Sequence, residues 1–142
     1  MQTEIAQLPF AEFSNRMDDI VPELFGREVH FHINLESKAN SFSFGIAKSP
    51  VNADEIYIPY DLMSSGEKTL LAFAIMSYIA KNSSSELKLV MIDDMLDHLD
   101  DTNIKALFEK FSNENIQIIN AGVKSVFGRK RIGIYLFINE IT

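Results

Sequence analysis

The sequence predicts a mixed α/β fold in which antiparallel strands come first and parallel strands with flanking helices follow. Two observations carry this prediction. The first half contains short runs of alternating character joined by a polar turn, which is typical of a strand pair. The second half alternates short apolar runs with helical patterns, which is typical of a parallel α/β layer. Because there is no internal repeat, low-complexity stretch or linker-like break, residues 1–142 are expected to form one domain.

The first half is expected to open with an amphipathic helix. Apolar residues recur at helical spacing from about Pro9 to Phe25, and Gly26 is expected to end the helix. Residues 28–35 and 41–46 then form the strand pair. Residues 55–60 are a third short extended run.

The second half is expected to begin with a helix over residues 67–80, where almost every residue is apolar or small. A helix that is apolar all round is buried on several sides. Residues 87–92 have the composition of a strand buried within a sheet. An amphipathic helix follows around residues 104–111, and residues 116–119 and 132–138 are two further strands.

Composition bounds the class of protein. Hydrophobic residues make up 46% of the 142 residues and charged residues 23%, which is ordinary for a soluble globular protein. The net charge of -7 argues against binding nucleic acid through the whole surface, although a local basic patch remains compatible with it. The absence of cysteine excludes disulfides and thiolate metal sites. With neither a membrane-length apolar run nor a signal-like N-terminus, a cytoplasmic, nucleoid or nuclear location is expected.

The first segment whose residues are suited to binding or catalysis is a capped helix start. It reads Ser64-Ser65-Gly66-Glu67-Lys68. Ser64 and Glu67 fit a capping box, in which each side chain satisfies a backbone N–H that the helix leaves without an acceptor. Such a helix start can also bind an anion. Taken alone, the segment favours the simpler interpretation of a well-capped helix.

The second segment is the apolar run that ends in Asp93 and Asp94. A strand of this kind delivers both carboxylates to the carboxyl edge of the sheet, where open α/β sheets bind their ligands. Two carboxylates there suit a hard cation such as Mg²⁺, with one of them free to orient or deprotonate a water. Taken alone, a polar turn that caps the next helix explains the pair equally well.

A third segment, Met95 to Asp100, follows directly, and together the three segments resemble the C-terminal half of ABC ATPases, which have a P-loop NTPase-like fold. Residues 63–68 resemble the signature motif, which in the SMC branch reads Leu-Ser-Gly-Gly-Glu-Lys. Residues 87–94 resemble the Walker B strand, and Leu99-Asp100 resembles the D-loop. The opening helix before a strand pair is similar to the point where the returning coiled coil of SMC-like proteins enters the head.

The resemblance implies a site shared by two heads that enclose two ATP molecules. Asp93 would hold Mg²⁺ through water, and Asp94 occupies the position of the catalytic glutamate that polarises the attacking water. Ser64, Ser65 and Gly66 would contact the γ-phosphate of ATP bound to the opposite head. The implied set of nucleotide-binding and interface residues is Ser64, Ser65, Gly66, Glu67, Lys68, Leu99 and Asp100.

Three positions depart from the pattern of the family. Asp94 is one methylene shorter than glutamate, and a displacement of about 1 Å can cost on the order of 10²-fold in rate. Ser65 stands where the motif has its first glycine. Residues 120–123 lack the histidine that many ABC proteins carry after the corresponding strand. These departures keep open the alternative of a catalytically eroded module that dimerises or docks partners in a nucleotide-dependent way.

The phosphate loop is missing, because the sequence contains no Gly-x-x-x-x-Gly-Lys-Ser/Thr. The resemblance implies that an N-terminal Walker A lobe supplies this loop, so the chain is expected to be an excised lobe or half of a split ATPase. ATP hydrolysis is therefore expected only in the completed head, with a second head as partner. The resemblance also implies DNA as a partner of the full complex. Residues 124 and 129–131 form a basic cluster that is either a solvated loop or a DNA backbone contact.

Overall fold

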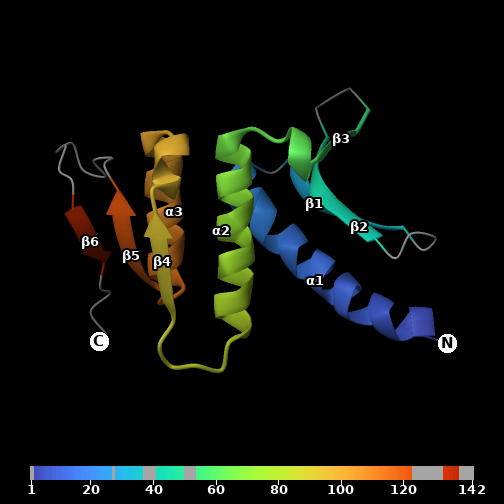
Figure 1. Cartoon of the computed structure of the whole chain (residues 1–142), viewed down its shortest axis with the longest axis horizontal. Helices are drawn as coiled ribbons and strands as arrows, with labels where there is room; N and C mark the ends of the chain where they lie inside the picture. The colour runs from blue at the N-terminus through green and yellow to red at the C-terminus, as the bar shows by residue number, and fades with distance from the viewer. Residues whose placement is uncertain (1, 27, 37–40, 50–53, 123–132, 138–142) are drawn as a thin grey trace. The chain divides into compact units, whose positions relative to one another are not determined.

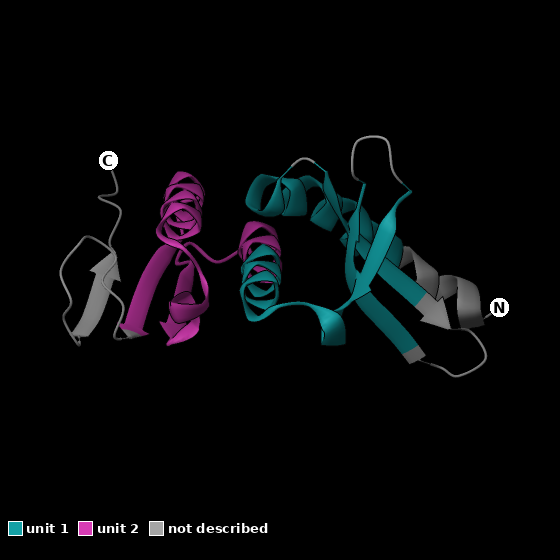
Figure 2. Ribbon diagram, turned by 90° about the horizontal axis from the view of Figure 1, so that it is seen from above, with its two compact units in different colours: residues 1–74 teal, residues 75–142 magenta. Residues whose placement is uncertain are grey.

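The computed structural model describes residues 2–26, 28–36, 41–49, 54–122 and 133–137. The chain divides into two compact units, residues 1–74 and residues 75–142 (Figure 2). The basic cluster at residues 124 and 129–131 lies outside the described residues.

The first unit opens with helix α1 (Gln2–Phe25), which ends where the sequence predicts. Gly26 has a φ of 107°, and its N–H donates to the carbonyl of Pro22 at 3.0 Å. Because glycine adopts this left-handed conformation without steric cost, it closes the helix. The helix begins earlier than the predicted start near Pro9, since one proline inside a helix removes a single hydrogen bond and kinks it without always ending it.

Strands β1 (Val29–Glu36), β2 (Ser41–Lys48) and β3 (Ile56–Pro59) form an antiparallel sheet in the order β1-β2-β3. The predicted antiparallel first half is therefore confirmed. Helix α1 packs against β1 (Figure 1). The ring of Phe13 meets that of Phe31 edge to face, with centroids 5.5 Å apart, and the backbone N–H of Phe31 donates to Asp18 Oδ1 at 3.0 Å.

Gly45 permits the close approach of β2 and β3. A Cβ atom at this position would lie well within 3.0 Å of the carbonyl oxygen of Ile58, which is a backbone atom and cannot move aside cheaply. The position therefore requires glycine. After β3, the short helix η1 (Tyr60–Leu62) leads into helix α2 (Ser65–Asn82), which starts slightly before the predicted residue 67.

The second unit holds the rest of α2 and a second sheet with the strand order β4-β5-β6. Its elements are β4 (Leu89–Asp93), η2 (Met95–His98), α3 (Asp101–Asn113), β5 (Gln117–Gly122) and β6 (Gly133–Phe137). Strands β4 and β5 are parallel, as predicted, whereas β6 runs antiparallel to β5. The connection from β5 to β6 consists of residues 123–132. It is shorter than the dozen or more residues that a parallel crossover needs, so the two strands run antiparallel.

The core of the second unit lies between α3 and β5, which pack against each other (Figure 1). Ile104, Leu107 and Phe111 form the buried face of α3, as its amphipathic pattern predicts. Ile116 and Ile118 are buried at and just before β5. The helical periodicity of α3 and the strand alternation of β5 thus place apolar side chains of both elements in one shared layer.

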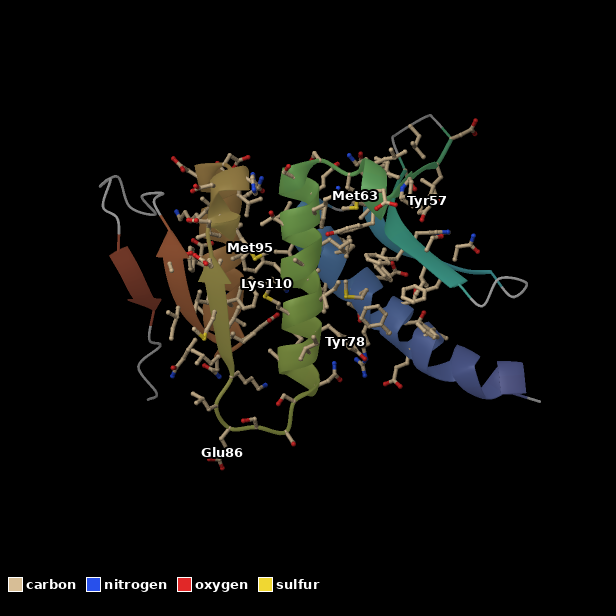
Figure 3. All side chains as sticks on the ribbon, in the orientation of Figure 1. Tyr57, Met63, Tyr78, Glu86, Met95 and Lys110 are labelled. Carbon is tan, nitrogen blue, oxygen red and sulfur yellow. The ribbon has the colours of Figure 1, made fainter. Side chains whose placement is uncertain are left out.

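Glu114 joins the C-terminal ends of α2 and α3. Its carboxylate accepts a hydrogen bond from Ser77 Oγ at 2.6 Å and ion pairs with Lys81 at 2.9 Å and with Lys110 at 3.0 Å. Lys110 belongs to the last turn of α3 and is labelled in Figure 3. Burial alone would raise the pKa of Glu114, but the hydrogen bonds from Ser77, Lys81 and Lys110 outweigh burial and lower it. The lysines also offset the unfavourable position of a carboxylate at a helix C-terminus.

We expect Glu114→Gln to lower the free energy of unfolding at pH 7 by about 1–2 kcal/mol, because it removes charge-assisted hydrogen bonds. A folded-state pKa below the unfolded value stabilises the protein above the unfolded pKa, and that stabilisation is lost as the pH falls through the folded pKa. The free energies of unfolding of the unchanged chain and of Glu114→Gln, both measured by urea denaturation, should therefore approach each other as the pH falls below about 4.

Glu109→Gln is the matched control, because Glu109 is an exposed carboxylate whose nearest lysine nitrogen lies 3.9 Å away on the same helix. This change should cost less than about 0.5 kcal/mol at any pH. Equal losses of unfolding free energy in the two variants at pH 7 would contradict the idea that the ion pairs of Glu114 stabilise the second unit.

Candidate functional site

The segment that resembles the signature motif forms a capped start of α2 within the first unit. The backbone N–H of Ser64 donates to Glu67 Oε2 at 2.9 Å, and the N–H of Glu67 donates to Ser64 Oγ at 3.3 Å. This reciprocal pair confirms the predicted capping box. Buried Met63 anchors the chain just before it, between η1 and α2 (Figure 3).

Glu67 also fixes the helix start to the antiparallel sheet. Its Oε1 forms an ion pair with Lys48 Nζ on β2 at 2.6 Å. Partial burial would raise the pKa of Glu67, but the hydrogen bonds from Lys48 and Ser64 outweigh it and lower the pKa. Both carboxylate oxygens of Glu67 are therefore engaged inside this unit, and sequence reasoning missed Lys48 because the pairing joins residues far apart in the chain.

Lys68 folds back onto η1. Its Nζ donates to the carbonyl oxygen of Asp61 at 3.3 Å and lies 5.2 Å from the centroid of the Tyr60 ring. A cation at this distance from an aromatic face is attracted to it. Glu67 and Lys68 thus hold the segment from two sides.

Ser64, Ser65 and Gly66 remain as the part of the segment that can meet a ligand. Ser64 and Ser65 are exposed, and Gly66 is partly exposed. Helix geometry gives the amides of Ser65 and Gly66 no acceptor inside the helix. Exposed hydroxyls beside such amides suit the oxygens of a phosphate.

Asp93 and Asp94 stand at the carboxyl end of β4 in the second unit. Both are exposed, so neither carboxylate is held inside the core. Asp93 pairs in register with Ala121 of the parallel strand β5, and the N–H of Asp94 donates to the carbonyl of Ala121 at 2.9 Å. This is the sheet edge at which the sequence predicts them.

The backbone of Asp94 is left-handed, with φ 52° and ψ 5°. Aspartate and asparagine tolerate this region better than most residues other than glycine. The turn lifts the chain away from β4 directly after Asp93 and starts η2. Non-glycine residues in this conformation are found at functional sites more often than elsewhere.

The segment that resembles the D-loop has local structural roles as well. Leu99 is buried. Asp100 caps α3, because its Oδ1 accepts from the N–H of Asn103 at 2.8 Å and its Oδ2 accepts from the Asn103 side-chain amide at 2.9 Å. This cap fixes the start of the amphipathic helix α3.

Asn120 is a buried polar residue whose position sequence reasoning left without a role. It lies in β5 opposite Ile92, and its Oδ1 has no hydrogen-bond partner among the described residues. A buried unsatisfied amide oxygen costs free energy, so this position is not explained by the packing of the second unit alone.

The two sets of residues belong to different compact units, with Ser64 to Lys68 in the first and Asp93 to Asp100 in the second. In the described part of the chain, no three histidine or acidic side chains gather closely enough to hold a metal ion. The acidic pair nevertheless fits Mg²⁺, because this ion binds one or two carboxylates together with water and substrate phosphates.

Comparison with solved structures identifies the class of fold. The chain is similar, at 20% identity and a TM-score of 0.64, to a chain from structural work on ATP-driven dimerization and DNA-stimulated activation of SMC ATPases, with 96% of this chain and 90% of that chain covered. An SMC head domain from Pyrococcus furiosus, with an extended coiled coil and bound to the C-terminal domain of ScpA, matches at 20% identity and a TM-score of 0.57. An SMC head bound to the C-terminal winged-helix domain of ScpA matches at 19% identity and a TM-score of 0.59.

The match covers 92% and 95% of this chain but only 36% and 45% of the two ScpA-bound heads. No protein-family model matches the sequence, and no curated protein does. At about 20% identity the likeness establishes the fold alone, which is shared with SMC ATPase heads, as the resemblance in the sequence predicts. None of the helices in the described ranges has the length and apolar character that a membrane span requires.

Proposed function

We propose that this chain supplies the signature, Walker B and D-loop half-site of an SMC-like ATPase, which binds and hydrolyses ATP where two heads meet. The observation that carries the proposal is the position of Asp93 and Asp94. On a fold shared with SMC ATPase heads, both carboxylates are exposed at the carboxyl end of β4, where a strand of the Walker B kind would present them.

In the proposed site, Asp93 holds Mg²⁺ through water, and Asp94 orients and polarises the attacking water. The metal ion supplies charge stabilisation during the transfer of the phosphoryl group to water. Asp94 lies one residue further along, where its left-handed backbone turns the chain away from the strand. We infer that this turn lets the two carboxylates serve different roles.

Ser64, Ser65 and Gly66 contact the γ-phosphate of ATP held by the opposite head, through exposed hydroxyls and helix amides. Glu67 and Lys68 position this loop through Lys48 and Asp61. In the second unit, buried Leu99 and the cap made by Asp100 hold the D-loop for contact across the interface between heads.

The phosphate loop must come from a second lobe, in the same protein or in a separate chain, because the sequence has none. Two of the matched heads carry more than half of their chain outside the matched region, which supports a larger assembly. We place the assembled protein in DNA maintenance, repair or defence, in the cytoplasm, nucleoid or nucleus, with DNA as a partner of the full complex.

The test is to purify the chain alone and together with the phosphate-loop polypeptide of the same genome, and to measure ATP turnover and dimerisation in parallel. We expect no turnover by the chain alone, and turnover with ATP-dependent dimerisation by the combination. Turnover by the purified chain that Asp93→Ala abolishes would contradict the proposal.

The second candidate function is a catalytically eroded module that dimerises or docks partners in response to nucleotide. Asp94 in place of glutamate and Ser65 in place of glycine favour it. ATP-driven dimerisation of the assembled head without turnover would support this candidate against the first.

A further inference from the structure

Asn120 is a polar side chain in an apolar layer. It is 2% exposed, as are Ile118, two residues earlier on the same face of β5, and Ile92, which lies opposite it on β4. Its amide oxygen Oδ1 has no hydrogen-bond partner among the described residues. Burying an amide without replacing its hydrogen bonds to water costs free energy, and an apolar side chain would avoid that cost. The packing of the second unit therefore gives no reason for an amide at this position.

The same residue lies next to the backbone contact that holds the Asp94 turn. Ala121, which follows Asn120, pairs in register with Asp93, and its carbonyl accepts the N–H of Asp94 at 2.9 Å. Asp94 has a left-handed backbone, with φ 52°, which also costs free energy in a residue other than glycine. Two unfavourable features are thus joined through Ala121. Features of this kind persist where the function of a protein uses them.

The short helix η2 has hydrogen-bond donors for which the helix itself offers no acceptor. It begins at Met95, which is labelled in Figure 3, and it packs against both β4 and β5. Helix geometry gives the N–H groups of Met95 and Leu96 no acceptor inside the helix, and the side chain of Asp94 makes no capping hydrogen bond. The amide oxygen of Asn120 therefore lacks a donor, while an element that packs on the same strand has donors to give.

We propose that Asn120 is a positioning residue for the Asp94 turn, and that its Oδ1 accepts a hydrogen bond from the N–H of Met95 or Leu96 when the head closes around ATP. This inference rests on the proposed function. In the closed state η2 shifts over β5, the amide is no longer unpaired, and Asp94 is held where it polarises the attacking water. Because the two states differ in this contact, nucleotide binding can shift the chain from one to the other.

The test replaces Asn120 with valine, which removes the amide and suits a strand. Ile118→Val is the matched control, because it shortens a buried side chain on the same face of β5 and changes no polar group. The isolated chain is melted first. We expect Asn120→Val to raise the melting temperature by about 2–6 °C, since it removes an unsatisfied amide, and Ile118→Val to lower it.

ATP turnover is then measured in each head assembled with the phosphate-loop polypeptide of the same genome. We expect Asn120→Val to lower kcat at least about tenfold and to leave KM within about twofold, because Asp94 is misplaced in the chemical step while the nucleotide contacts remain. Ile118→Val should leave both constants within about twofold. A change that stabilises the chain and yet slows the reaction separates a functional amide from a structural one.

Amide hydrogen exchange measures the proposed hydrogen bond itself. A non-hydrolysable ATP analogue should protect the amide of Met95 or Leu96 in the unchanged head and in Ile118→Val, but neither amide in Asn120→Val. Equal protection in Asn120→Val, or unchanged turnover, would overturn the inference. So would a melting temperature of Asn120→Val below that of Ile118→Val, because it would mean that the amide is already paired in the free chain.

The outcomes separate this inference from the proposed function. If the unchanged head hydrolyses ATP and Asn120→Val does so at the same rate, the function stands and the role of Asn120 is wrong. If the analogue protects the start of η2 only when Asn120 is present, but no ATP is hydrolysed, the hydrogen bond stands and the ATPase proposal is wrong. If the assembled head binds no nucleotide, both fail.

Discussion

In the assembled head, Asp94→Asn is expected to lower ATP turnover by at least about 10²-fold, because an amide cannot accept a proton from the attacking water. Steady-state phosphate release from the chain combined with its phosphate-loop polypeptide measures the effect. ATP-dependent dimerisation should persist, since the proposed role of Asp94 is in the chemical step and not in holding the nucleotide.

The backbone of Asp94 makes this substitution well suited to the test. Asparagine adopts the observed φ of 52° as readily as aspartate does, so Asp94→Asn should not disturb the turn between β4 and η2. Asp97→Asn is the control, because it neutralises another exposed carboxylate within η2 and should leave turnover unchanged. An Asp94→Asn head that hydrolyses ATP at the original rate would remove Asp94 from the proposed mechanism.

The second large effect concerns stability. Phe111→Ala is expected to lower the free energy of unfolding by about 3–5 kcal/mol, because it deletes a fully buried ring and leaves a cavity that its neighbours fill only in part. Phe111 lies on the face of α3 that also carries Ile104 and Leu107. Urea denaturation followed by circular dichroism measures the loss.

Phe108→Ala is the matched control for this prediction. It makes the same chemical change on the same helix, but Phe108 is only partly buried, so the cost should be less than half that of Phe111→Ala. Equal costs for the two variants would mean that the core of the second unit is not centred on the face that carries Phe111.

Local patterns predict most of the secondary structure, because they depend on contacts between residues close in the chain. The alternation in β1 and β2, the capping box of Ser64 and Glu67, and the glycine that ends α1 all follow from near neighbours, and the structure contains each of them. The start of α1 and the direction of β6 were less predictable. A proline inside a helix can be tolerated, and alternation does not say which way a strand runs.

The candidate site also has features that the sequence predicts and features that it does not. The order of the three segments and the position of Asp93 at the end of an apolar strand can be read from the sequence alone. The contacts of Glu67 with Lys48 and of Lys68 with Tyr60 could not be predicted, because they depend on how the antiparallel sheet and η1 lie beside the start of α2. The left-handed backbone of Asp94 could not be predicted either, and its N–H donates to the carbonyl of Ala121 on another strand, a pairing that spacing along the chain does not specify.

By itself, the sequence determined that this chain has an antiparallel half followed by an α/β half with parallel strands, that its three motifs resemble those of SMC-like heads, and that residues 1–142 contain no phosphate-loop motif. Only the tertiary structure decided that Glu67 is bound within its own unit, that Asp93 and Asp94 are exposed, and that β4 pairs with no strand other than β5 among the described residues. The physical reason is that spacing along a chain specifies periodicity and caps, whereas exposure and pairing depend on which distant segments come to lie beside each residue.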